Sequence, residues 1–257
     1  MSLTGHHAVV TGAGSGIGRA TAERLAEAGC QVTLIGRHVA RLNETADRIG
    51  DLAFAATADV TDPDMLAAAI EVGRDRFGPI DILVNNAGAA TSAPFLKTDA
   101  EALRAMLALN LEAPAEAARL VLPGMLTRRW GRIVNVASTA GLKGYPYVSA
   151  YVAAKHGLVG LTRALALEVA AKGVTVNAVC PGFTETELVA KSVESIIAKT
   201  GRSEEEARAA LAASNPQGRL ITPDEVATTI VWLCGDGASG VNRSEEHTSE
   251  LQSPCNL

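Results

Sequence analysis

The stretch TGAGSGIG, residues 11–18, follows an apolar run and opens a segment of helical composition. Its residues Gly12, Gly16 and Gly18 would permit a tight turn, a close approach of backbone to a pyrophosphate, and close packing of a helix on a strand. The amino terminus of that helix would add free N–H donors and the positive end of its dipole. A purely structural turn explains such a loop equally well, so its context decides between the two interpretations.

The rest of the chain alternates strand-like and helix-like segments. Short apolar runs at 8–12, 31–36, 81–88, 132–138 and 174–179 are separated by segments of helical period. Strands that are apolar throughout and joined by helices indicate a parallel sheet covered on both faces. A chain of 257 residues, 47% of them apolar, is long enough to bury one large core. We therefore predict an α/β fold: a single-domain, Rossmann-like, doubly wound parallel sheet.

Residues 183–215 form an insertion with a helical pattern of its own, flanked by Pro181 and Pro216. A helical excursion after the carboxyl end of a strand tends to cover the ligand crevice of such a sheet. We predict that this insertion is a substrate lid.

Charge and composition argue against several classes of function. The formal net charge is −5 and the basic residues are scattered singly, so no nucleic-acid footprint is present. The amino terminus lacks a signal pattern, and no apolar run approaches the ~18 residues of a membrane span. The cysteines stand far apart without metal-ligand spacing, which is typical of reduced thiols. We expect a cytoplasmic protein without nucleic-acid, membrane or metal partners. His6, His7 and His38 have no evident partners, and such histidines are more often surface residues than catalytic ones.

A series of short motifs follows the glycine turn. They are Asp59-Val60, Asn85-Asn86-Ala87-Gly88, Asn110, Ser138, Tyr151-x-x-x-Lys155, and Pro181-Gly182 followed by Thr184 and Thr186. Together with the Gly-x-x-x-Gly-x-Gly spacing of the turn, this order resembles the short-chain dehydrogenase/reductase family over about residues 5–242. Any one motif arises easily by chance, whereas the whole series in order is specific.

The resemblance implies a nicotinamide cofactor and a set of residues that bind it. They are Gly12, Ser15, Gly16, Ile17, Gly18, Arg37, Asp59, Val60, Asn86, Ala87, Gly88, Tyr151, Lys155, Pro181, Gly182, Thr184 and Thr186.

The end of the run 31–36 bears on which cofactor is used. An acidic residue there would bind the ribose hydroxyls and repel a 2′-phosphate, whereas this chain has Gly36 and then Arg37. Arginine suits a phosphate, so NADP is favoured over NAD. Two observations weaken the preference: Ser15 stands where many NADP-dependent relatives carry a second basic residue, and a solvated charge at a helix start is an alternative role for Arg37.

Tyr151 and Lys155 lie four residues apart in a segment of helical composition, so their side chains share one helix face. A nearby ammonium favours phenolate, which would bring the tyrosine pKa toward the working pH. Ser138 closes a strand at its carboxyl end, where ligands bind in open parallel sheets. An isolated Tyr and Lys would more simply be a surface pair on an amphipathic helix.

The resemblance assigns a role to each of four catalytic residues. Ser138 would hydrogen-bond the substrate carbonyl oxygen, and Tyr151 would transfer the proton. Lys155 would hold the nicotinamide ribose, and Asn110 would hold a water that links Lys155 to solvent.

Among relatives, the chain resembles ketoreductases of the fatty-acid and polyketide type and also 3-hydroxybutyrate dehydrogenases. Where the latter place polar or cationic side chains around a substrate carboxylate, this chain has Ala140 and Val148. We therefore favour a larger ketone or a 3-oxoacyl thioester over a small free acid. The resemblance also implies a homotetramer. A non-catalytic nicotinamide sensor and an epimerase of the extended branch are the remaining alternatives, the latter needing a larger carboxyl-terminal domain.

The polar run RSEEHTSELQSPCNL, residues 243–257, has no period of two and stands where relatives have a final apolar strand. It matches one reading frame of a translated sequencing adapter. We therefore expect a domain of residues 1–242, a missing last strand, and an artefactual tail.

Replacing residues 243–257 with a family-like ending of Gly, alternating apolar residues and Asp-Gly-Gly should stabilise the protein. A sheet without its last strand leaves an unpaired edge and exposed apolar helix surface. Restoring about 2 kcal/mol should raise the melting temperature by about 4 to 8 °C. Thermal melting and size-exclusion chromatography compare the two proteins. Equal stability and assembly of both would show that the tail is genuine protein.

Overall fold

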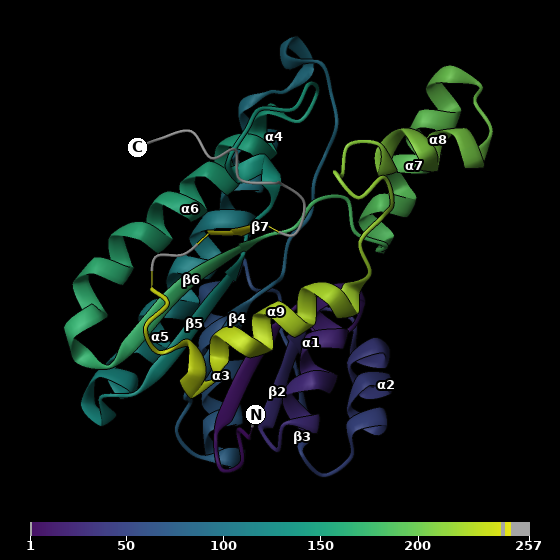
Figure 1. Cartoon of the computed structure of the whole chain (residues 1–257). Coiled ribbons are helices and arrows are strands. Elements are labelled where there is room, and N and C mark those ends of the chain that lie inside the picture. The colour runs from purple at the N-terminus through teal and green to yellow at the C-terminus, as the bar shows by residue number, and fades with distance from the viewer. Residues whose placement is uncertain (1, 243–244, 248–257) are drawn as a thin grey trace.

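A computed structural model describes residues 2–242 and the backbone of residues 245–247 (Figure 1). Its parallel strands form one sheet in the order β3-β2-β1-β4-β5-β6-β7. The strands are β1 (His7–Thr11), β2 (Gln31–Gly36), β3 (Ala53–Thr57), β4 (Ile82–Asn85), β5 (Gly131–Val136), β6 (Val174–Cys180) and β7 (Glu245–His247). The doubly wound α/β fold predicted from the sequence is confirmed.

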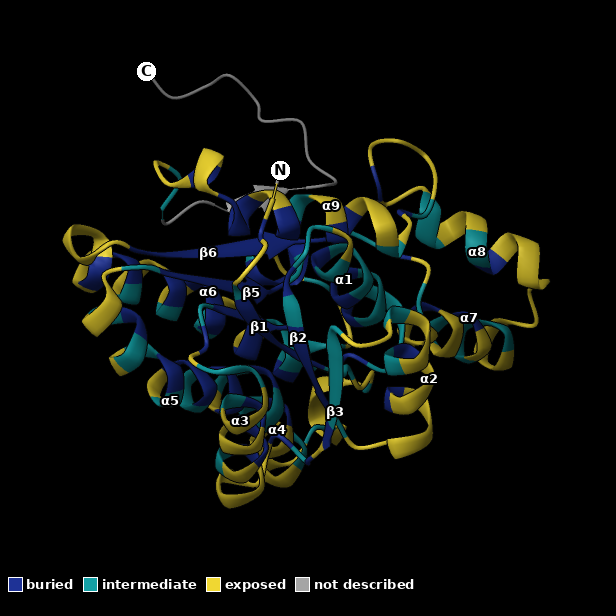
Figure 2. Ribbon diagram, turned by 90° about the horizontal axis from the view of Figure 1, so that it is seen from below, coloured by how far each residue is buried: buried dark blue, intermediate teal, exposed yellow. Residues whose placement is uncertain are grey.

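Helices cover both faces of this sheet (Figure 2). They are α1 (Gly16–Glu27), α2 (Val39–Ile49), α3 (Pro63–Phe77), α4 (Ala100–Leu107), α5 (Ala113–Arg128), α6 (Ser149–Val169), α7 (Glu187–Thr200), α8 (Glu204–Ala212) and α9 (Pro223–Cys234). Val10 on β1 packs in one apolar cluster with Leu25 of α1 and Ile230 of α9. Its neighbour Val9 belongs to the opposite cluster, with residues of α3 and α5. Successive residues of a strand point to opposite faces, so both must be apolar.

The chain order places a crevice at the carboxyl end of β1. From β1 the chain moves outward through β2 to β3 and then returns to pair β4 on the other side of β1. Ligands bind at such a reversal, outside the carboxyl ends of the strands. The insertion at 183–215 contains α7 and α8, which Figure 1 shows as an arm beyond the two helical layers. None of the described helices is long and apolar enough to cross a membrane.

The expectation of a missing last strand is corrected in one respect. The backbone of Glu245–His247 forms the short strand β7, which pairs in parallel with Ala178–Cys180 of β6. Just before it, the side chain of Asn242 accepts a hydrogen bond from the backbone N–H of Val176 at 2.8 Å. Three residues with the sequence EEH are enough to pair this edge, because backbone hydrogen bonds do not require apolar side chains. Residues 243–244 and 248–257 lie outside the described residues, so the assignment of the tail as an artefact stays a prediction.

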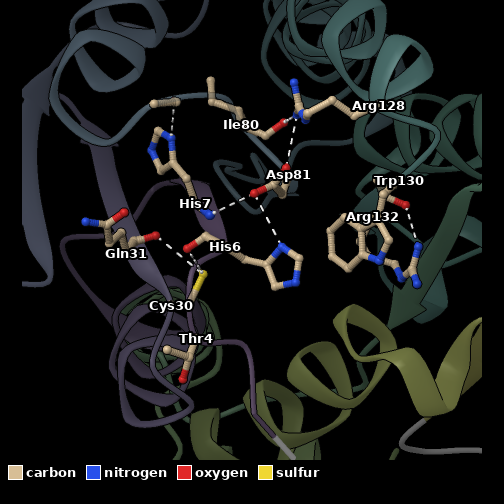
Figure 3. Close-up of polar contacts among 12 residues, drawn as sticks. Thr4, His6, His7, Cys30, Gln31, Ile80, Asp81, Arg128, Trp130 and Arg132 are labelled. Atoms are coloured by element: carbon tan, nitrogen blue, oxygen red, sulfur yellow. Dashed lines mark hydrogen bonds and ion pairs between the residues drawn. The ribbon is translucent and has the colours of Figure 1, made fainter.

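His6 and His7 were expected at the surface, and for His7 this is wrong. Its side chain is buried, with Nδ1 2.9 Å from the Gly78 carbonyl oxygen and Nε2 2.8 Å from Thr33 Oγ1. His6 is half-buried and stacks on Trp130 with ring centroids 4.1 Å apart. Figure 3 shows Asp81 between the two histidines, where it accepts from the His7 backbone at 3.2 Å. This cluster closes the end of the sheet opposite the crevice.

The buried His7 should make stability depend on pH. Burial lowers its pKa from the ordinary 6.5, and hydrogen bonding to Gly78 opposes the shift less strongly. The unfolded chain therefore binds the proton at a higher pH than the folded protein does. The stabilisation is fully present above about pH 6.5 and is lost as the pH falls from there through the folded-state pKa.

Urea unfolding between pH 5 and 8 should show that His7→Gln reduces the slope of unfolding free energy against pH. The reduction is at most about 1.4 kcal/mol per pH unit, the limit for one proton. His156→Gln, which changes an exposed histidine on α6, is the matched control and should keep the slope. An unchanged slope in His7→Gln would contradict the assignment.

Candidate active site

The glycine turn joins β1 to α1 by backbone geometry that only glycine adopts readily. Gly12 and Gly16 have φ of 66° and 52°, in the left-handed region. A Cβ on Gly18 would lie 2.3 Å from the Gly12 carbonyl oxygen and 2.4 Å from Asn86 Nδ2. At the helix start, the described structure gives Ser15 no side-chain capping hydrogen bond. The first N–H groups of α1 therefore remain available to phosphate oxygens, which is the donor set that a dinucleotide needs.

Thr11 and Asn86 tie the turn to the neighbouring strand β4. Thr11 Oγ1 accepts hydrogen bonds from the backbone N–H groups of Asn86 and Ala87, both at 3.0 Å. Asn86 Nδ2 in turn donates to the Thr11 carbonyl oxygen at 2.9 Å. These bonds fix the carboxyl ends of β1 and β4 against each other at the point where the strand order reverses.

A pocket lies over this point. It is lined by Gly12, Gly14, Ser15, Gly36, Arg37, His38, Arg41, Leu42, Ala58, Asp59, Val60, Ala87, Gly88 and Leu109. The structure thus brings together seven of the cofactor residues predicted from the sequence, namely Gly12, Ser15, Arg37, Asp59, Val60, Ala87 and Gly88. Of the other residues predicted there, Gly16, Ile17, Gly18 and Asn86 lie at the turn behind the pocket.

Arg37 and Asp59 face each other across the pocket. The ion pair between them is long, 3.7 Å, and the Arg37 side chain is 65% exposed, so the guanidinium remains accessible to a ligand. Hydrogen bonds from the backbone and hydroxyl of Thr61 lower the pKa of Asp59, and Arg37 lowers it further.

Ser138, Tyr151 and Lys155 meet at the carboxyl end of β5. Lys155 is buried and its Nζ donates to the Val136 carbonyl oxygen at 2.8 Å. The same nitrogen lies 5.7 Å from the centroid of the Tyr151 ring. Ser138 Oγ accepts from the Ala140 N–H at 3.1 Å, and its side chain also hydrogen-bonds Tyr151. The three residues predicted from separate motifs therefore form one cluster.

The expectation that Lys155 lowers the pKa of Tyr151 is not met. Burial raises the pKa of Tyr151 to about 12, and the hydrogen bond with Ser138 offsets only part of this. The Lys155 ammonium donates its hydrogen bond to the Val136 carbonyl oxygen and not to the tyrosine oxygen. Burial also lowers the pKa of Lys155 to about 8. In this state the tyrosine keeps its proton and is a donor.

Asn110 lies in a π-helical turn, Ala108–Glu112, between α4 and α5. The side chain of Asn110 is fully buried, and Nδ2 donates to the carbonyl oxygens of Ala89 and Met106, both at 3.1 Å. Its Oδ1 has no partner among the described residues. An orphaned buried acceptor fits a water-mediated role, and π turns are frequent at functional sites.

Gly88 shows how near Asn110 lies to the catalytic lysine. A Cβ on Gly88 would meet Asn110 Oδ1 at 2.9 Å and Lys155 Nζ at 3.6 Å. The two polar groups thus border the same small space, as expected if Asn110 and Lys155 act together with Ser138 and Tyr151.

The segment 181–186 runs from the end of β6 to the start of α7. The Pro181 carbonyl oxygen accepts from the Thr139 N–H at 3.0 Å, next to Ser138. The hydroxyl of Thr184 donates to the Gly182 carbonyl oxygen at 3.1 Å, and that of Thr186 donates to the Thr184 carbonyl oxygen at 3.2 Å. The Thr186 methyl is 3.1 Å from the Cβ position of Gly16. This segment therefore joins the catalytic cluster to the glycine turn.

Comparison with known proteins identifies the family. The family model described as short chain dehydrogenase matches residues 6–196. The chain belongs to this family. A D-beta-hydroxybutyrate dehydrogenase of Rhizobium meliloti (strain 1021) is 39% identical over 91% of this chain and 93% of the relative. The 3-oxoacyl-(acyl-carrier-protein) reductase FabG of Vibrio cholerae is 36% identical over 97% of this chain and 98% of its own length.

A solved structure of actinorhodin polyketide ketoreductase with NADPH superposes with a TM-score of 0.92 at 37% identity, covering 97% of this chain and 98% of that one. The protein is thus an NAD(P)-dependent oxidoreductase that interconverts ketone and secondary alcohol. Ketoreductases and hydroxybutyrate dehydrogenases match at similar identity.

Sequence reasoning missed several pocket residues, among them His38, Arg41 and Leu109. A signal for Arg41 was present: it is a second basic residue shortly after Arg37, in the first turn of the helix that follows.

Arg37→Ala should weaken NADPH binding at least tenfold while changing NADH binding little, because a charge-assisted contact to a phosphate is lost. Fluorescence titration of both cofactors measures this. Arg48→Ala, which removes a charge from the last turn of α2, the helix that follows Arg37, is the control and should leave both affinities unchanged. Equal losses for NADPH and NADH in Arg37→Ala would remove Arg37 from the phosphate site.

Proposed function

We propose that the protein is an NADP-dependent ketoreductase whose substrate is a 3-oxoacyl thioester or a ketone of similar size. The observation that carries the proposal is the convergence of Ser138, Tyr151, Lys155 and Asn110 at the carboxyl ends of the strands, beside the pocket that contains Arg37. We further propose that it acts as a cytoplasmic homotetramer, as the family resemblance implies.

Proton transfer follows from the ionisation of the two central residues. A bound nicotinamide would supply the hydride. The hydroxyls of Ser138 and Tyr151 would hold the carbonyl oxygen, and Tyr151 would release its proton as negative charge develops there. The Lys155 ammonium, 5.7 Å from the ring, would then stabilise the phenolate.

After each turnover the Tyr151 phenolate must be reprotonated, which needs a path for a proton from solvent. The pKa of Lys155, lowered by burial to about 8, allows this residue to release and regain a proton near neutral pH. Asn110 Oδ1, buried and without a described partner, would accept from a water beside Lys155.

The surroundings of the cluster support a large, uncharged substrate. Ala140 is buried next to Ser138 and offers no cation to a carboxylate.

Aromatic and apolar side chains lie on the neighbouring loops. The Tyr145 hydroxyl is hydrogen-bonded to Thr139 Oγ1 at 2.9 Å. The Tyr147 carbonyl oxygen accepts from the Ala93 N–H, and the Tyr147 ring is 64% exposed. Phe95 and Leu96 follow Ala93 in the chain, and they are 75% and 97% exposed. These exposed apolar side chains lie on two loops, one of which joins Ser138 to Tyr151 and is hydrogen-bonded to the other, and we take them to favour an acyl chain over a small acid.

Tyr151→Phe should reduce the turnover of a 3-oxoacyl thioester by at least about 10²-fold, because only the proton donor is removed. NADPH absorbance with acetoacetyl-coenzyme A, acetoacetate and a panel of ketones measures turnover, and fluorescence titration should show unchanged NADPH binding. Tyr147→Phe, which alters an exposed tyrosine, is the control and should keep most of the activity.

Two results would contradict the proposal. Faster turnover of acetoacetate than of the thioester would favour the hydroxybutyrate alternative. Retention of most of the activity in Tyr151→Phe would overturn the assigned proton donor.

A further inference from the structure

Two arginines line the proposed adenosine end of the pocket, and the structure pairs them differently. Within residues 2–242, Arg37 makes only the long contact of 3.7 Å with Asp59. Arg41, on α2, places Nη1 2.6 Å and 2.8 Å from the two carboxylate oxygens of Glu187. Glu187 is the first residue of α7 in the lid, 146 positions away in the chain. Arg41, the second arginine of the pocket, is therefore ion-paired with α7.

Arg41 and Glu187 stand on either end of the glycine turn. The Cβ position of Gly14 lies 3.1 Å from Arg41 Cβ. The Cβ position of Gly16 lies 3.1 Å from the methyl of Thr186, the residue before Glu187. The ion pair thus spans the turn from α2 to α7. On the α2 side Arg41 packs closely on Gly14, and on the α7 side Thr186 packs closely on Gly16.

The ion pair with Glu187 leaves some of the N–H donors of Arg41 unused. Both contacts to Glu187 use Nη1, and a guanidinium has further N–H groups on Nη2 and Nε. The hydrogen bond to Arg41 lowers the pKa of Glu187, so the carboxylate is ionised at neutral pH. Other charged groups near Glu187 are Lys191 of the same helix and His38 on the pocket wall. A phosphate that approached Arg41 would meet the Glu187 carboxylate, which repels it and competes for the same cation.

Building on the proposed function, we propose that Glu187 sets the strength of 2′-phosphate recognition by competing with the phosphate for Arg41. Arg41 is then the second basic residue that the glycine turn lacks at Ser15, and Glu187 is the specificity-determining residue that restrains it. Binding free energies are reciprocal, so a phosphate that engages Arg41 also weakens the contact that holds the first turn of the lid.

The test uses fragments of the cofactor, so that no turnover is required. Isothermal titration at low ionic strength compares 2′,5′-ADP, which carries the 2′-phosphate, with 5′-AMP, which does not. Glu187→Gln should tighten 2′,5′-ADP binding about two- to fivefold, the range typical of partly exposed ion pairs, and leave 5′-AMP unchanged. Arg41→Ala should weaken 2′,5′-ADP binding, and Glu187→Gln should have a smaller effect when added to Arg41→Ala than it has alone, because only direct repulsion of the phosphate then remains. The difference should shrink at high salt.

Glu194→Gln is the matched control, because it removes an exposed carboxylate from the same helix α7. It should leave both affinities unchanged. The inference is overturned if Glu187→Gln affects 2′,5′-ADP and 5′-AMP equally, weakens 2′,5′-ADP, or acts as strongly when Arg41 is absent. If neither fragment binds the unmodified protein, the proposed function itself fails, which is a separate outcome.

Discussion

The set of hydrogen bonds that joins Thr11 to Asn86 and Ala87 is the constraint on which the rest of the site depends. Two backbone N–H groups of one strand end meet the hydroxyl of the other, and the Asn86 amide returns a bond to the Thr11 carbonyl. The same amide nitrogen occupies the space that a side chain at Gly18 would need. A single polar residue therefore sets how closely β1, β4 and α1 approach, and with them the floor of the pocket.

The site combines two opposite uses of burial. Burial keeps the proton on Tyr151 and makes the proton of Lys155 easier to lose. Ketone reduction needs a protonated tyrosine at the start of each cycle, so the unliganded state is already prepared for that direction. Alcohol oxidation would begin with a deprotonated tyrosine, which burial disfavours.

The sequence was sufficient for features set by local spacing. The glycine turn, the shared helix face of Tyr151 and Lys155, and the alternation of strands and helices all follow from residues close in the chain. Features set by distant residues were not accessible. His7 is buried through partners 26 and 71 positions away, and Arg41 pairs with Glu187 across 146 positions of chain. The raised pKa of Tyr151 was not foreseen because it comes mainly from burial, which the folded chain as a whole produces.

The π turn at Ala108–Glu112 has a consequence for the whole segment from α4 to α5. One α-helical residue advances the direction of a side chain by about 100°, and a π turn holds one residue more than an α turn. The two helices are therefore out of phase by about that angle, although they follow one another along the chain. Accordingly α4 packs against α6, whereas α5 presents Ala117 and Val121 to the sheet. An insertion of one residue thus lets a single stretch of chain serve two surfaces, with Asn110 at the step between them.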